Sequence, residues 1–307
     1  MICIKAPASL ANLGPGFDVL AMAIQNPFDI VGLERIKEPN IIIEAMGPHG
    51  SALPLDATMN VVEPVLVGAA KMAKYEGGFR VKIWKGIKPA SGLGSSGADA
   101  AATACGVTKL LGLKLSDWEL SWLAAMGEAK AAGSPHMDNA SASLFGGFII
   151  INQELRRIIK LDTWDFPIIL VTMGSKPSTQ YMRSLLPRTV ELRASVHNLA
   201  GLASLIHAVI SRDLDLLGMS IEMDELATPY RAKAYDHLQR VKETLHRYGA
   251  LGVALSGSGP SMFGVFREEP CIECIRRELG NAWVMLTRPS NSGAVEAECP
   301  SEFKGAP

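Results

Sequence analysis

The feature that most constrains this chain is the stretch 89–98, Pro-Ala-Ser-Gly-Leu-Gly-Ser-Ser-Gly-Ala, which runs directly into an alanine-rich segment. Glycine allows positive φ values and a close approach of the backbone to a ligand. Ser95 and Ser96 stand where a helix is expected to begin, so free N–H groups and the positive end of the helix dipole face outward. The stretch predicts a phosphate-binding loop; the alternative is a glycine-rich connection that only turns the chain. The residues assigned to this loop are Pro89, Ala90, Ser91, Gly92, Leu93, Gly94, Ser95, Ser96, Gly97 and Ala98.

Two common types of phosphate loop fit this stretch poorly. A Walker A loop needs Gly-Lys followed by Ser or Thr, and the chain contains no such run. Gly92 to Gly97 matches the G-x-G-x-x-G of a dinucleotide fold. However, the preceding strand at 79–84 alternates between apolar and polar side chains, and a spacer separates it from the glycines. The residue near the expected acidic position, Asp117, lies in a capping box that opens a helix. A dinucleotide-dependent oxidoreductase is therefore the weaker alternative.

Three motifs in order resemble those of the GHMP small-molecule kinases. They are Ala-Pro-Ala-Ser-Leu-Ala-Asn-Leu-Gly-Pro-Gly-Phe-Asp at 6–18, the loop just described, and Leu-Ser-Gly-Ser-Gly-Pro-Ser-Met-Phe at 255–263. The resemblance implies an α+β GHMP kinase fold, with an N-terminal domain like ribosomal S5 domain 2 at 1–155. It also implies a C-terminal, ferredoxin-like α/β sandwich at 156–299 and the use of ATP with Mg²⁺. The tail at 300–307 is expected to be disordered.

Further segments resemble the homoserine kinase branch of that family. They are Met-Gly-Glu-Ala at 126–129, Gly-Ser-Pro-His-Met-Asp-Asn at 133–139 before the Gly-Gly pair at 146–147, a run at 178–187, and Pro-Tyr-Arg at 229–231. The resemblance implies phosphorylation of the side-chain hydroxyl of L-homoserine. Mevalonate, shikimate and galactose kinases share the loop, so these acceptors stay open. Counted back from the Gly-Gly pair, Asn139 rather than Asp138 falls in the register of the catalytic base of mevalonate-type kinases.

The resemblance also implies roles for individual residues. Ser96 and Glu128 would hold Mg²⁺, Asn60 would lie near the adenine, and Glu128, Arg183 and Asn139 form the catalytic set. An amino-acid acceptor needs a planar cation for its carboxylate and an oxygen for its ammonium. The residues assigned to substrate binding are Asn12, Asp18, His136, Asp138, Thr179, Arg183 and Arg231.

Each of these residues also has an ordinary structural interpretation. The arginines would then be surface charges, Asp138 and Asn139 turn residues, and His136 a structural histidine. Asn12 and Asp18 would only shape a turn, and Glu128 would be solvated on a helix. The loop departs from the family at two positions, Ala90 where many relatives have Gly and Gly97 where Ala is usual. Neither change removes a backbone N–H.

Alternation, helical periodicity and turn residues predict a mixture of strands and helices. Strands are expected at 2–6, 30–36, 41–45, 79–84, 144–152, 168–173, 251–256 and 283–287. Helices are expected at 60–76, 98–111, 116–131, 189–212, 231–248 and 271–279. The polar stretch 153–165 marks the expected domain boundary.

Composition and charge limit the kinds of partner that we expect this protein to bind. The 307 residues include 30 basic and 31 acidic side chains, for a formal net charge of −1, and contain no basic run, which argues against nucleic acid as the main partner. We expect no membrane partner, because no apolar stretch approaches the roughly 20 residues of a transmembrane helix, and the N-terminus has no signal-peptide pattern. A cytoplasmic protein is expected, and a homodimer because relatives often pair.

The five cysteines are scattered along the chain. Cys271 and Cys274 form a lone C-x-x-C pair within an expected helix, and the others are Cys3, Cys105 and Cys299. With no second pair or histidine nearby, a zinc site is disfavoured. Ordinary thiols in a reducing compartment are the expectation.

Overall fold

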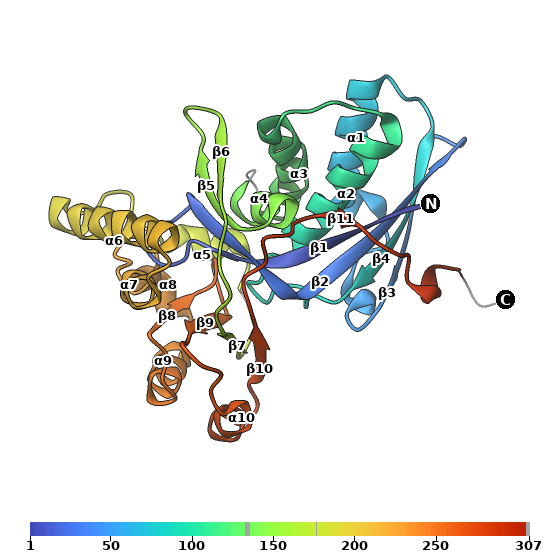
Figure 1. Ribbon diagram of the computed structural model, residues 1–307. Coiled ribbons are helices and arrows are strands. Elements are labelled where there is room, and N and C mark those ends of the chain that lie inside the picture. The colour runs from blue at the N-terminus through green and yellow to red at the C-terminus, as the bar shows by residue number, and fades with distance from the viewer. Residues whose placement is uncertain (133–135, 176, 305–307) are drawn as a thin grey trace.

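Two β-sheets organise the chain in the computed structural model, which describes residues 1–132, 136–175 and 177–304 (Figure 1). Within those residues the first sheet has the order β11-β1-β2-β4-β3, with β5 added to β2 and β6 to β5. All its pairings are antiparallel except that of β3 with β4. Its strands are β1 (Ile2–Ala11), β2 (Leu20–Ile36), β3 (Ile41–Met46), β4 (Gly78–Lys85), β5 (Phe148–Asn152), β6 (Arg157–Leu161) and β11 (Val295–Glu296).

Four helices gather on one face of this sheet (Figure 1). They are α1 (Val62–Ala73), α2 (Ser95–Leu111), α3 (Asp117–Ala132) and α4 (Asp138–Phe145). Helix α2 packs directly on β1 and β2 because its buried positions are mostly Ala and Gly. A Cβ added at Gly106 would lie 2.6 Å from Leu33 Cδ1. This close packing fixes the first turn of α2, and the loop before it, against the sheet.

The second sheet lies in the later half of the chain and has the order β10-β7-β9-β8, with every pairing antiparallel. Its strands are β7 (Ile168–Thr172), β8 (Gly252–Leu255), β9 (Met262–Val265) and β10 (Trp283–Thr287). The accompanying helices are α5 (Thr179–Ser184), α6 (Leu192–Ser211), α7 (Leu214–Ser220), α8 (Thr228–Arg231), α9 (Leu238–Arg247) and α10 (Ile272–Leu279). Strand β7 is buried along its whole length, as its continuous apolar run predicts.

Short 3₁₀ helices complete the described secondary structure, at Gly50–Ala52, Ala57–Met59, Ala232–Ala234 and Ser301–Lys304. One expected element is partly wrong in type, and another is wrong in extent. The strand expected at 144–152 is the end of α4 followed by β5, because Gly146 and Gly147, with φ of 70° and 75°, separate them. The single helix expected at 231–248 is broken between α8 and α9. Strands β6 and β9 and helices α5 and α7 had no counterpart in the expected elements.

The end of the chain returns to the first sheet. β11 pairs with β1, and Lys82 Nζ donates a hydrogen bond of 2.8 Å to the carbonyl of Phe303, whose ring is buried. The chain is therefore ordered through Ser301–Lys304, unlike the expected disordered tail, while 305–307 lie outside the described residues. The first sheet also continues through β6, beyond the expected boundary at 155.

The expectation of free thiols is wrong for four of the five cysteines. Disulfides join Cys3 to Cys299 and Cys271 to Cys274, while Cys105 remains a free thiol. The pairing of β11 with β1 brings Cys3 and Cys299 to a Cα–Cα distance of 5.3 Å. Their separation of 296 residues gives no local signal of this contact.

Helix α6 is another departure from expectation. By length and composition this 20-residue apolar helix could cross a membrane, and it is the one such helix in the part of the chain described. The sequence analysis predicts no apolar stretch of this length. One helix of this kind is weak evidence for a membrane span.

Candidate active site

The three motifs meet at one pocket of about 440 Å³. Its wall combines the turn after β1, the glycine-rich loop, the start of α4, and the turn between β8 and β9. Fifteen of the residues selected from the sequence line it: Asn12, Asp18, Asn60, Pro89, Ala90, Gly92, Gly94, Ser95, Ser96, Glu128, His136, Asp138, Asn139, Arg183 and Arg231. Three further lining residues, Ser178, Gly257 and Ser258, lie in segments singled out from the sequence but were given no role there. The lining residues that sequence analysis missed are Leu53, Pro54, Met59, Val61, Asp99 and Pro177.

The glycine-rich loop ends at the N-terminus of α2, with its backbone held in left-handed conformations. Gly92 has φ of 85°, and Gly94, the N-cap of α2, has φ of 69°. A Cβ at Gly92 would lie 2.6 Å from the Gly259 carbonyl oxygen, and one at Gly94 would lie 2.3 Å from Ser9 Oγ. Glycine is thus required at both positions for conformation and for space. The helix N-terminus opens on the pocket, as an anion site requires.

The third motif, at 255–263 in the C-terminal part of the chain, holds this loop through hydrogen bonds. Ser256 Oγ donates to the Gly92 carbonyl at 2.6 Å, and the Ser261 N–H donates to the Ser91 carbonyl at 3.1 Å. The Gly257 N–H donates to the Ala11 carbonyl at 3.1 Å, which ties in the first motif as well. The motifs therefore form one connected unit around the pocket.

Four of the selected loop residues do not line the pocket. Ser91, Leu93, Gly97 and Ala98 are buried and face the interior instead. A Cβ at Gly97 would lie 2.9 Å from the Cβ of Asn139. The departure from the family at this position is therefore a matter of packing against α4.

Ala90, the other departure from the family, has φ of 57°. A residue with a Cβ is strained in this left-handed region by roughly 1–2 kcal/mol. The family's usual Gly would avoid that cost, so this change affects backbone strain rather than a phosphate contact.

A buried charge cluster that sequence analysis missed lies beneath the loop. Lys85 Nζ is 2.6 Å from Asp29 Oδ2, 2.5 Å from Asp99 Oδ2 and 2.9 Å from the Ser95 carbonyl. Asp29 Oδ1 accepts from the N–H groups of Gly86 and Ile87. The cluster therefore ties the end of β4 and the entry to the loop to the first turn of α2.

One cation faces two carboxylates in this cluster, and none of the three side chains is appreciably exposed. Burial raises the pKa of Asp29, and burial raises the pKa of Asp99 to about 7. Burial alone would lower the pKa of Lys85, but the two carboxylates raise it. Lys85 is therefore a fixed cation directly behind the loop.

At the far end of the pocket, Arg183 joins the two halves of the chain. Its Nη2 is 2.7 Å from Asp18 Oδ2, and its Nη1 is 3.0 Å from His136 Nε2. His136 and Arg183 thus contact each other at the pocket wall.

Arg231 lies deeper than Arg183. Arg231 is 6% exposed. Its Nη1 donates to the Gly257 carbonyl at 2.9 Å, and its guanidinium carbon lies 5.1 Å from the ring centroid of Phe17. Burial lowers its pKa. Phe17 was missed as a site residue, although it lies inside the first motif. Asn12 and Asp18 do shape that motif's turn, with φ of 71° and 55°, and they also line the pocket.

Asp138 and Asn139 begin α4. Asp138 is buried, and its Oδ1 accepts the Asn139 N–H at 2.8 Å. Burial, and then the charge of Asp18, raises the pKa of Asp138. Asn139 Oδ1 accepts from Ser9 Oγ at 2.9 Å. Ser9 is a further residue that sequence analysis did not select, and it holds Asn139 at the edge of the loop.

Glu128 and Ser96 supply the hard oxygen ligands that Mg²⁺ prefers. Both line the pocket, and Glu128 is 7% exposed, so it is not solvated on a helix surface. A carboxylate and a hydroxyl beside a phosphate loop fit a metal that completes its coordination with phosphate and water. Within the described residues there is no group of three or more His, Cys, Asp and Glu that could hold a metal ion.

Asn60 lines the pocket but also stabilises its own segment. Its Nδ2 donates to the Pro54 carbonyl at 2.8 Å, and its Oδ1 accepts the Val62 N–H at 3.2 Å. The side chain of Thr179 and residues 133–135 lie outside the described part of the structure.

Comparison with known proteins identifies the family. The family model of the GHMP kinase N-terminal domain matches residues 61–147, and that of the GHMP kinase C-terminal domain matches 205–284. The chain belongs to the GHMP kinases. It is 36% identical to the homoserine kinase of Methanococcus vannielii over 288 residues, which is 93% of this chain and 95% of that protein. It is 40% identical to that of Pyrococcus horikoshii over 266 residues, 86% of this chain and 87% of that protein.

Solved structures agree with this assignment. A homoserine kinase from Cytophaga hutchinsonii superposes with a TM-score of 0.87 at 27% identity, covering 96% of this chain and 97% of that one. A mevalonate kinase superposes with a TM-score of 0.70 at 17% identity, covering 95% and 100%, which supports the fold alone. The GHMP kinase fold with its two α+β parts is thus confirmed. The dinucleotide alternative fails because the loop follows β4 in a sheet whose pairings are antiparallel apart from that of β4 with β3, whereas a dinucleotide fold has a mostly parallel sheet.

Proposed function

We propose that this chain is a homoserine kinase, which transfers the γ-phosphoryl group of ATP to the side-chain hydroxyl of L-homoserine. The observation that carries the proposal is the single pocket that joins an anion-binding helix N-terminus to two arginines and buried acids. The homoserine kinases at 33–40% identity over most of the chain support it. The product is O-phospho-L-homoserine, a precursor in threonine biosynthesis.

The phosphates of ATP are assigned to the loop from Gly92 to Ser96. Backbone N–H groups and the dipole of the 17-residue helix α2 favour an anion there. The buried cation of Lys85 lies behind the same turn and holds it through the Ser95 carbonyl. The adenine is assigned to the part of the pocket near Asn60.

Ser96 and Glu128 are the residues that would hold Mg²⁺. When bound, the ion would neutralise charge on the β- and γ-phosphate oxygens.

The amino-acid acceptor is assigned to the end of the pocket formed by Arg183, Arg231 and the acids. A guanidinium fork suits the carboxylate of the acceptor. Asp138, with Asp18 and Asn12 nearby, offers oxygens to its ammonium group. Together these groups would fix the hydroxyl at the loop, and positioning supplies most of the catalysis in phosphoryl transfer.

The hydroxyl proton does not require a side-chain base in this arrangement. Asn139 occupies the register of the mevalonate-type base, and an amide does not accept a proton at neutral pH. In a loose transition state the nucleophile needs little activation, so the proton can pass directly to a phosphate oxygen.

An acceptor screen tests this proposal. Purified protein with Mg-ATP should form ADP in the presence of L-homoserine, and much more slowly with mevalonate, shikimate or galactose. Equal turnover with any of these three would overturn the choice of acceptor while leaving the kinase assignment. Stabilisation against heat by NAD(P) but not by Mg-ATP would overturn both.

We also propose a cytoplasmic homodimer. Helix α6 exposes Leu192, Val196, Leu199 and Ile210, an apolar face that a second copy could cover. Sedimentation velocity should show a dimer, and Leu199→Glu should shift it towards the monomer. A monomer at all concentrations would contradict this proposal.

A further inference from the structure

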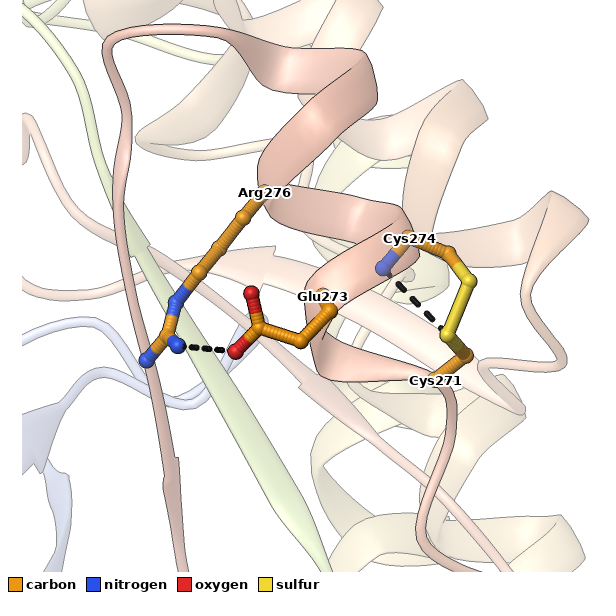
Figure 2. The surroundings of a disulfide bond; sticks show 4 residues. All are labelled: Cys271, Glu273, Cys274 and Arg276. Carbon is orange, nitrogen blue, oxygen red and sulfur yellow. Dashed lines mark hydrogen bonds and ion pairs between the residues drawn. A yellow bond between two sulfur atoms is a disulfide. The ribbon is translucent and has the colours of Figure 1, made fainter.

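The first turn of α10 carries a disulfide that the proposed kinase activity does not use. Cys271 is the N-cap of this eight-residue helix, and it is bonded to Cys274 one turn later. Figure 2 shows the disulfide and the Arg276 side chain projecting to opposite sides of the helix. Neither cysteine lines the active-site pocket.

Cys271 is the reactive sulfur of the pair. It is exposed, whereas Cys274 is half-buried, so an incoming thiol reaches Cys271 first. Its Sγ accepts the Cys274 N–H at 3.3 Å, and the helix dipole adds positive potential at the same point. Both effects stabilise a thiolate at Cys271 once the bond opens.

Two acidic side chains close to Cys271 in the sequence, Glu269 and Glu273, oppose this stabilisation little, because each is paired with an arginine. Glu273 Oε1 lies 2.5 Å from Arg276 Nη1, and Glu269 Oε1 lies 2.5 Å from Arg288 Nη2. Each negative charge is thus matched by a guanidinium, as Figure 2 shows for Glu273.

The disulfide contributes little to holding α10 in place. Stabilisation by a crosslink grows with the length of the loop it closes, and here the cysteines are three residues apart, against 296 for Cys3 and Cys299. The helix is fixed by other groups. Ile275 and Leu279 are buried in the core, and Arg276 Nη2 donates to the Val284 carbonyl at 2.9 Å. The bond can therefore open while the helix stays docked.

We propose that Cys271 and Cys274 form a reversible dithiol–disulfide site that exchanges with a dithiol reductant. One thiolate of the reductant attacks Cys271 Sγ, the bond to Cys274 breaks, and Cys274 leaves as a thiolate and takes up a proton. The second thiol of the reductant then attacks its own sulfur in the mixed disulfide and releases Cys271. Two electrons and two protons pass to the protein, and the reductant becomes a disulfide.

The Cys3–Cys299 bond provides an internal control, since Cys3 is only 2% exposed and Cys299 is half-buried, whereas Cys271 is exposed. The folded protein is treated with dithiothreitol, quenched with N-ethylmaleimide at intervals, and mapped by peptide mass spectrometry. Cys271–Cys274 should open at least about tenfold faster than Cys3–Cys299, because exchange requires access to the sulfur. The circular dichroism spectrum should not change, and oxidised dithiothreitol should close the bond again.

Single variants identify the reactive sulfur. Cys274→Ser leaves Cys271 as a thiol, which should form a mixed disulfide with oxidised glutathione. Cys271→Ser is the matched control, and its Cys274 should react at least about tenfold more slowly. The proposal is overturned if the bond opens only on unfolding, if it does not close again, or if Cys274 is the faster thiol. The first two outcomes are measured on the native chain, so they do not depend on the variants folding.

Discussion

The charge cluster behind the glycine-rich loop predicts an unusual pH dependence of stability. With Asp29 and Asp99 both ionised, the cluster holds one net negative charge with no appreciable exposure to water. Burial raises the pKa of Asp99 from 3.8 to about 7. Asp99→Asn removes this ionisation and keeps an oxygen that can accept from Lys85 Nζ.

The sign of this pH dependence follows from the direction in which the pKa of Asp99 is shifted. The folded state binds the Asp99 proton more tightly than the unfolded state, so the stabilisation is complete below about pH 4 and is lost as pH rises through 7. A shift of about three units corresponds to about 4 kcal/mol at roughly 1.4 kcal/mol per unit. Of this, about 3 kcal/mol is lost between pH 5 and 8.

Urea unfolding of the wild type and Asp99→Asn at several pH values measures this loss. The wild type should lose about 3 kcal/mol relative to the variant between pH 5 and 8, because the titrating groups outside the cluster of Asp29, Lys85 and Asp99 cancel in the comparison. Asp215→Asn is the matched control, since Asp215 is exposed beside Arg267 and its variant should follow the wild type. A difference between wild type and Asp99→Asn that stays constant across this range would refute the reasoning.

Three further substitutions test the assigned roles. Glu128→Gln keeps the size of the side chain but removes its charge, so kcat should fall on the order of 100-fold or more while the unfolding temperature changes little. A near wild-type kcat would exclude Glu128 as a metal ligand. Asp138→Asn should raise KM for homoserine more than it lowers kcat; a loss of about 1,000-fold in kcat at unchanged KM would instead identify Asp138 as the base. Gly97→Ala should cost about 1–3 kcal/mol of stability and lower kcat, because the new Cβ would lie 2.9 Å from the Cβ of Asn139; an unfolding curve identical to the wild type would show that α4 accommodates the methyl group.

Sequence analysis located most of the pocket because the motifs carry their chemistry locally. A glycine-rich loop before a helix is recognisable from spacing alone, and its place at the N-terminus of α2 is as expected. The joining of Arg183 to Asp18 is different, since 165 residues separate them. Their residue types suggested a shared substrate, but only the folded chain reveals that they contact each other.

The charge cluster was missed although the sequence carries a signal for it. Phe79, Val81 and Ile83 lie on the buried face of β4, and the period of two places Lys85 on that same face. Asp99 is likewise the one acid in the alanine-rich start of α2. A charge on an apolar face needs a partner, and pairing these residues would have predicted the cluster. The expected strand at 79–84 ends one residue before Lys85, so the sequence analysis does not place Lys85 on this face.

The disulfides could not be predicted in the same way. Cys3 and Cys299 approach because β11 returns to β1, which is a property of the whole topology. The prediction of a strand over 144–152 was also wrong. Its apolar residues suit either element, and the Gly-Gly pair that divides α4 from β5 was considered only as part of a motif.

The contact between Ser9 and Asn139 bears most directly on the chemistry. Asn139 Oδ1 already accepts the Ser9 hydroxyl at 2.9 Å, and a Cβ at Gly94 would collide with both side chains. The amide oxygen is thus engaged next to the loop, and what Asn139 can present to a bound phosphate or hydroxyl is its amide N–H donors. Donors orient oxygen atoms and stabilise negative charge, but they do not remove a proton. In the proposed reaction, Asn139 therefore acts as an orienting group although its register is that of a base, and we expect the proton of the acceptor hydroxyl to leave by way of the phosphate.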